Sequence, residues 1–115
     1  MRRAAIWIAF AIAFSAGPTP FVAAAELIAV EHARCAICLR FDATVARSYR
    51  RSAEGRAAPL RRVDIARRVP AYVEGIRVVP TFILRDKGRE IGRFEGFTDA
   101  ASFYRRVGAL LARAD

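Results

Sequence analysis

The apolar positions of the segment from residue 26 to residue 52 predict a short strand followed directly by a helix. Leu27, Ile28 and Val30 stand between polar flanks, so residues 26–32 are predicted to form a strand. From Ala36 to about Ser52, apolar residues recur at every fourth position, which is typical of a helix with one buried stripe. The predicted stripe consists of Ile37, Phe41, Val45 and Tyr49.

The middle of the chain has a less regular pattern. A glycine and a proline predict a loop over residues 54–59, and the imperfect alternation that follows predicts a strand over residues 60–65. Residues 66–74 are weakly helical, but Pro70 lies near their middle. Because proline disturbs the interior of a helix, we expect a short or broken helix there.

The last part of the chain predicts a hairpin and a helix. β-Branched and aromatic residues over 81–84 predict a strand, residues 86–88 a hairpin turn, and residues 90–97 the returning strand. Thr98 or Asp99 can then cap a final helix. One face of that helix is apolar and is lined by Phe103, Val107, Leu110 and Leu111.

The predicted order of elements is therefore β-α-β-α-β-β-α. The first two strands are separated by a helix and should be parallel, whereas the last two should form an antiparallel hairpin. A mixed four-stranded sheet with flanking helices satisfies both requirements. The chain is accordingly predicted to be a single α/β domain.

The first 25 residues have the pattern of a secretory signal peptide. Arg2 and Arg3 precede an apolar stretch over residues 4–14, and Ala23-Ala24-Ala25 has the small side chains of a cleavage site. The apolar stretch is shorter than the ~20 residues that span a bilayer. We therefore expect residues 1–25 to be removed and residues 26–115 to form the domain, with a retained N-terminal anchor as the alternative.

The chain is strongly basic, with a formal net charge of +9. Removal of the two arginines of the predicted signal peptide would lower this charge to +7. The remaining arginines are scattered in pairs, without the interleaved aromatic residues that stacking on bases would require. We therefore expect no binding to nucleic acid, although the charge suits an acidic protein partner.

Cys35-Ala36-Ile37-Cys38 is the motif that carries candidate chemistry, because it lies where the first strand leads into the first helix. The spacing places both sulfur atoms on one side of the first turn, and the helix N-terminus favours a thiolate. Cys35 would then attack a disulfide of another protein and Cys38 would resolve the mixed disulfide. Two alternatives stay open: a copper(I) site that adds His32, and a purely structural disulfide. A closed zinc site lacks ligands, and we expect no metal and no cofactor.

Val79-Pro80-Thr81 opens the third predicted strand. Proline has no N–H group and cannot join a central ladder, but it is tolerated at the first residue of a strand. A cis peptide bond before Pro80 would be a deliberate feature, and the alternative is an ordinary trans proline on an edge strand.

The segment from Gly75 to Leu84, followed by Lys87-Gly88 and Gly96, resembles the second half of a thioredoxin. The resemblance implies a thioredoxin-like fold of glutaredoxin size and a cis Pro80 beside Cys35 and Cys38. It also implies that the substrate chain binds at Val79, Pro80 and Thr81, through the Val79 backbone.

Residues 41–64 and 92–97 are more similar to the SoxS-like periplasmic thioredoxins of bacterial sulfur-oxidation systems. This resemblance implies a periplasmic reductase that restores a blocked cysteine of a sulfur-carrier protein. Its electrons would come from a membrane thiol transporter, and we expect a monomer.

The sequence at and before the C-x-x-C motif departs from the common thioredoxin pattern at three places. Arg34 replaces the usual tryptophan, and Ala36-Ile37 replaces the usual dipeptide between the cysteines. Ala29 stands where many thioredoxins have a buried acid. Proton transfer to and from Cys38 would then depend on water, Glu31 or His32, although His32 is interpreted first as an ordinary strand-end residue.

Overall fold

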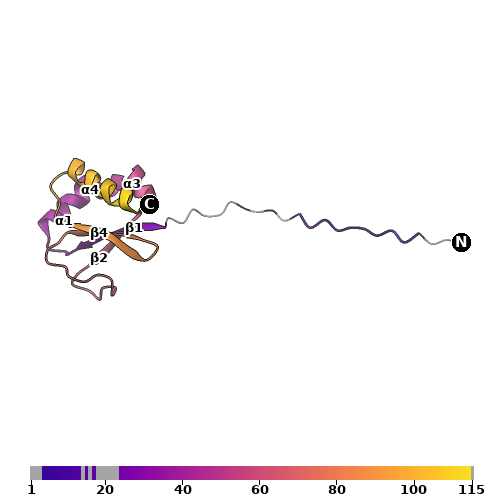
Figure 1. The fold of residues 1–115 in the computed structure, drawn as a ribbon, viewed down its shortest axis with the longest axis horizontal. Helices are drawn as coiled ribbons and strands as arrows, with labels where there is room; N and C mark the ends of the chain where they lie inside the picture. The colour runs from indigo at the N-terminus through magenta and orange to yellow at the C-terminus, as the bar shows by residue number, and fades with distance from the viewer. Residues whose placement is uncertain (1–3, 14, 16, 18–23, 115) are drawn as a thin grey trace.

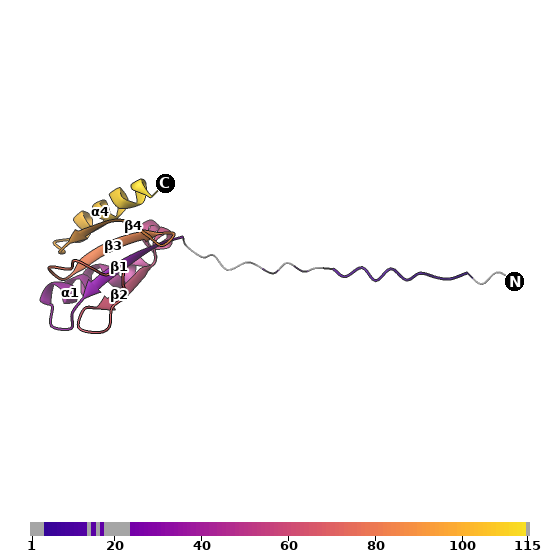
Figure 2. The ribbon, with the colours of Figure 1, turned by 60° about the horizontal axis from the view of Figure 1, so that its bottom comes forward.

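The computed structural model describes residues 4–13, 15, 17 and 24–114. It has one four-stranded sheet in the order β2-β1-β3-β4, formed by β1 (Ala25–Glu31), β2 (Leu60–Asp64), β3 (Thr81–Asp86) and β4 (Arg89–Glu95). β1 and β2 are parallel, while β3 is antiparallel to both β1 and β4. The predicted mixed sheet and α/β class are therefore confirmed (Figures 1 and 2).

The first helical segment runs on from the C-x-x-C motif in three parts. These are α1 (Ala36–Phe41), the π-helical turn η1 (Asp42–Ala46) and α2 (Arg47–Tyr49). The predicted helix over this region is thus confirmed, with a π-helical turn that the spacing of apolar residues did not indicate. Ile37 was wrongly placed in the buried stripe: its side chain is 43% exposed, and the stripe begins at Cys38.

Residues 54–59 were predicted to be a loop, but α3 (Ala53–Ala57) occupies most of this segment. The Ser52 side chain caps α3 by accepting a hydrogen bond from the Gly55 N–H at 2.9 Å. A serine cap can start a short helix even where a glycine follows. The loop prediction gave too much weight to Gly55 and missed this cap.

The short helix predicted over residues 66–74 does not form. The segment is instead held by side chains of the sheet. The Arg85 guanidinium lies 3.6 Å from the centre of the Tyr72 ring, and Arg93 donates a hydrogen bond to the Glu74 carbonyl oxygen at 2.6 Å. These contacts fix the loop that leads into Pro80 without any helix.

Two apolar clusters lie on opposite faces of the sheet, because successive side chains of a strand point to opposite sides. Leu27 and Ala29 belong to the larger cluster, which joins the sheet to α1, η1, α2 and α4. Ile28 and Val30 belong to the smaller cluster beneath the loop that precedes β3. In Figure 1, α1, α3 and α4 lie on the same side of the strands, over the larger cluster.

The predicted hairpin and final helix are both present. Lys87 and Gly88 form the turn between β3 and β4, and both have positive φ angles. Asp99, rather than Thr98, caps α4 (Ala100–Arg113) by accepting a hydrogen bond from the Ser102 N–H at 2.7 Å. Phe103, Val107 and Leu110 are buried as expected, and Leu111 is half-buried.

The N-terminal prediction falls only partly on described residues. Arg2, Arg3 and Ala23 lie outside them. The apolar segment 4–13 is exposed and extends away from the domain (Figure 1). Among the described residues, no helix is long and apolar enough to cross a membrane. Ala25, the last residue of the predicted signal peptide, is also the first residue of β1, and it pairs with Asp86 of β3. Removal of residues 1–25 stays a prediction.

Substitution of Gly55 by alanine should destabilise the domain. An added Cβ would lie 1.8 Å from the Tyr49 carbonyl oxygen, so the backbone would have to move. Overpacking of this kind costs about 1–3 kcal/mol of unfolding free energy. Gly108→Ala is a matched control, because nothing lies within 4 Å of a Cβ added on α4. Chemical denaturation would contradict the expectation if the two variants proved equally stable.

Candidate active site

The two cysteines lie at the junction of β1 and α1. The Cys35 N–H donates to the His32 carbonyl oxygen at 3.1 Å, which closes a turn immediately after β1. Cys35 is the N-cap of α1, and its Sγ accepts a hydrogen bond from the Cys38 N–H at 3.0 Å. A sulfur atom in this position receives a backbone N–H and the positive end of the helix dipole. Both favour a thiolate on Cys35 in the reduced protein.

The two sulfur atoms differ in their access to solvent. Cys35 and Cys38 are joined by a disulfide. Cys35 is half-buried, whereas Cys38 is only 5% exposed. An external disulfide can therefore approach Cys35 more easily than Cys38.

The loop before β3 brings a second segment to the cysteines. The Val79 carbonyl oxygen lies 3.6 Å from Cys35 Sγ, and the Val79–Pro80 peptide bond is cis, as the resemblance implied. Thr81 is buried and donates from its hydroxyl group to the Val78 carbonyl oxygen at 2.7 Å. The structure thus brings together Cys35 and Val79, which are separated by 44 positions in the sequence.

Three exposed apolar side chains lie on the two segments that meet at the disulfide. Ile37, Leu39 and Val78 are the large apolar residues with high exposure in the part of the domain from Ala24 to Ala114. They come from α1 and from the loop before β3, the two segments that meet at the disulfide. The exposure of Ile37 was not expected, because its spacing had placed it in the buried stripe.

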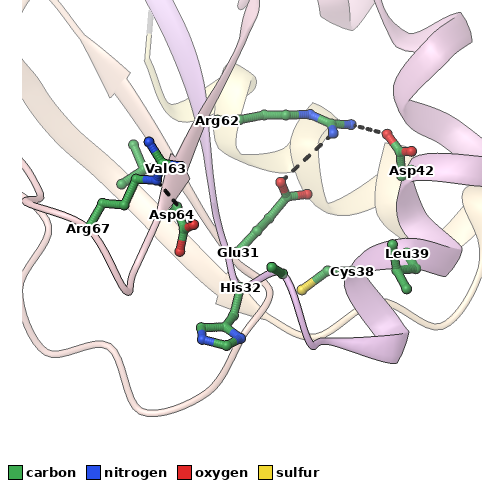
Figure 3. A pocket seen from close by; sticks show the side chains of 10 residues that line it. Glu31, His32, Cys38, Leu39, Asp42, Arg62, Val63, Asp64 and Arg67 are labelled. Carbon is green, nitrogen blue, oxygen red and sulfur yellow. Dashed lines mark hydrogen bonds and ion pairs between the residues drawn. The ribbon is translucent and has the colours of Figure 1, made fainter.

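A pocket of about 400 Å³ lies behind Cys38. Glu31 and His32 of the β1 end contribute to its wall, together with Cys38 and residues of η1 and β2. Figure 3 shows the Arg62 guanidinium between the carboxylates of Glu31 and Asp42. Glu31 and His32 were expected from the sequence, whereas Arg62 of β2 and Asp42 of η1, which are 20 positions apart, were not.

Glu31 is a largely buried acidic group on the wall of this pocket. Its side chain is 16% exposed, and burial raises its pKa above the ordinary value. The Arg62 charge opposes this rise in the pKa of Glu31, and the Asp42 charge adds to it. His32 lies on the same pocket wall, and its Nδ1 accepts a hydrogen bond from the Arg34 N–H at 3.1 Å.

The copper(I) alternative adds His32 to the two cysteines. Within the described part of the chain, no group of three or more His, Cys, Asp or Glu side chains could hold a metal ion.

A C-x-x-C helix N-terminus that faces a cis-proline loop is the arrangement of the thioredoxin-like thiol–disulfide oxidoreductases, and the chain is one of them. A solved structure that resembles it is the reduced form of the periplasmic thioredoxin SoxS from Paracoccus pantotrophus. The sequences are 31% identical, the match covers 79% of this chain and 99% of SoxS, and the TM-score is 0.74. The chain therefore belongs to the SoxS-like thioredoxins.

More distant structures share the fold. The thioredoxin of Malassezia sympodialis is 19% identical, with 76% of each chain covered and a TM-score of 0.63. A thioredoxin variant from Halobacterium salinarum is 18% identical, with 77% of this chain and 76% of its own covered and a TM-score of 0.64. No protein-family model matches the sequence, and no curated protein matches it either.

Proposed function

We propose that this protein is a periplasmic reductase that restores a cysteine of a partner protein. The observation that carries the proposal is the position of Cys35 Sγ: it is accessible, caps α1 and lies 3.6 Å from the Val79 carbonyl oxygen. A nucleophilic sulfur with this environment suits attack on a disulfide of another protein chain.

The reaction transfers two electrons from the reduced cysteine pair to the partner. The Cys35 thiolate attacks one sulfur of the partner's disulfide and releases the other sulfur as a thiolate. Cys38 then loses its proton and attacks Cys35 Sγ, which frees the partner and leaves the Cys35–Cys38 disulfide. The site that binds the partner comprises Val79, Pro80 and Thr81, because the Val79 backbone lies beside the reacting sulfur.

The periplasmic location is supported by two observations. Residues 1–25 have the pattern of a signal peptide, and SoxS of Paracoccus pantotrophus is a periplasmic thioredoxin. In an oxidising compartment the disulfide must be reduced again, so we propose a membrane thiol transporter as the electron donor. The N-terminal residue of the exported protein, determined by mass spectrometry, tests the cleavage after Ala25.

The partner is proposed to be a carrier protein of sulfur oxidation whose cysteine becomes blocked. A Cys38→Ser variant tests this proposal, because it can form the mixed disulfide but cannot resolve it. Affinity capture from periplasm should yield one predominant partner that a reductant releases. The Cys35→Ser/Cys38→Ser double variant is the control and should capture none. Equal capture by both variants would contradict the proposed attack by Cys35.

A further inference from the structure

We propose that Glu31 takes the proton from Cys38 during the resolving step, and that Arg62, shared between Glu31 and Asp42, sets the pH range of this transfer. The inference deepens the proposed function and rests on it, since it assigns the proton of the second step. It concerns the pocket behind Cys38, which the attack by Cys35 does not use.

The strand pattern directs Glu31 towards the cysteine helix. Leu27 and Ala29 of β1 belong to the apolar cluster that contacts α1 and α4. Residues two apart on a strand share one face, so Glu31 is the next side chain on that face. It lines the same pocket as Cys38 (Figure 3). A pocket of about 400 Å³ has room for the water that would connect the carboxylate and the thiol.

The ion pairs leave one oxygen of Glu31 without a partner. Arg62 lies 2.6 Å from Asp42 Oδ1 but 3.9 Å from Glu31 Oε2, so its hydrogen bond goes to Asp42. Glu31 Oε1 is buried and has no hydrogen-bond partner among the described residues. A buried acceptor in this state is stabilised when it receives a proton or a water molecule. Glu31 can therefore accept a proton at little cost to the surrounding structure.

The other titratable groups of the pocket already have partners. Asp64 of β2 accepts a hydrogen bond from the Ala66 N–H at 2.9 Å and lies 3.7 Å from Arg67. Nδ1 of His32, which follows β1, is occupied by the Arg34 N–H. Asp42 of η1 holds Arg62. Of the acidic groups that face the pocket, Glu31 is thus the one with an unpartnered buried oxygen.

The step is balanced in protons and electrons. The Cys38 thiol gives its proton through water to the Glu31 carboxylate, and the resulting thiolate attacks Cys35 Sγ. The bond between Cys35 and the partner breaks, and the partner leaves as a thiolate that carries the electron pair. Protonated Glu31 then returns its proton to water or to that thiolate.

The experiment follows one turnover of the fully reduced protein with dithiobis(nitrobenzoate), whose two halves absorb visible light when released as thiolates. The first half is released when Cys35 attacks, and the second half when Cys38 resolves the mixed disulfide. Stopped-flow absorbance over a range of pH separates the two phases. Glu31→Gln should leave the first phase unchanged and slow the second by about 10²-fold near neutral pH, and Glu31→Asp should restore part of the rate.

The rate of the second phase should fall at low pH, where Glu31 is protonated. Variants of the neighbouring groups should shift this acid limb of the pH–rate profile in opposite directions. Asp42→Asn removes a negative charge and frees Arg62 for Glu31, so the limb should move to lower pH. Arg62→Gln removes the positive charge, so the limb should move to higher pH. Asp64→Asn is the matched control, because Asp64 lines the same pocket, and it should leave the limb in place.

Two different results would overturn the role of Glu31, and they separate its failure from failure of the attack by Cys35. If Glu31→Gln leaves the rate and pH profile of the second phase unaltered while the first phase is intact, Glu31 has no part in the proton transfer. If the unaltered protein shows no first phase, the proposed attack by Cys35 fails, and the role of Glu31 fails with it.

Discussion

Replacement of Cys35 by serine should abolish disulfide reduction. The hydroxyl group of serine is not ionised near neutral pH, so the helix N-terminus and the Cys38 N–H would have no anionic nucleophile to stabilise. Loss of a nucleophile lowers turnover on the order of 10³-fold or more. The rate of reduction of a protein disulfide, with a dithiol reagent as electron source, measures the effect.

Cys38→Ser is the matched variant, because it removes the second sulfur and keeps the first. Attack by Cys35 should still occur, and the protein should accumulate as a stable mixed disulfide that intact mass spectrometry detects. In the reduced protein, alkylation should modify Cys35 before Cys38, since Cys38 is only 5% exposed. Alkylation of Cys38 first, or activity retained in Cys35→Ser, would contradict the assigned roles.

Most of the fold could be predicted from the sequence because its signals are local. The apolar residues of β1 between polar flanks and the Asp86-Lys87-Gly88 turn each act within a few residues. The position of the C-x-x-C motif between a strand and a helix follows from the same local patterns. Resemblance to thioredoxins then supplied what the pattern left open, namely the cis bond before Pro80.

The rest depends on contacts between distant segments. Residues 66–74 were predicted to be helical, yet they form a loop with turns that Arg85 and Arg93 of the hairpin contact. Local propensity cannot show that a strand side chain will stack on Tyr72. Asp42 and Arg62 were missed for the same reason, since only the register of β1 against β2 brings Arg62 to the pocket.

Ile37 illustrates a limit of periodicity. It has the spacing of the buried stripe, but it is 43% exposed. The buried position passes to Cys38, which the periodic pattern did not include. This difference affects the site, because it buries Cys38 and leaves an apolar side chain exposed on the helix that Cys35 caps.

Substitution of Phe41 by alanine should cost about 3–5 kcal/mol of unfolding free energy. Phe41 is fully buried, and its ring centre lies 4.9 Å from that of Phe82, 5.5 Å from Phe97 and 5.2 Å from Phe103. Removal of the ring would open a cavity where α1, the sheet and α4 meet. Since small domains are stable by only about 5–15 kcal/mol, the loss would bring this one close to unfolding.

Chemical denaturation at equilibrium measures this loss, and Phe94→Ala is the matched control. Phe94 also contacts Phe82 and Phe103, with ring centres 5.0 Å and 6.0 Å apart, but it is only half-buried, so its loss should cost less. If both variants lost equal stability, Phe41 would not be the centre of the core. Because Phe41 lies one helical turn after Cys38, a loosened core would also free the start of α1, and the reduced Phe41→Ala protein should lose the difference in alkylation rate between its two cysteines.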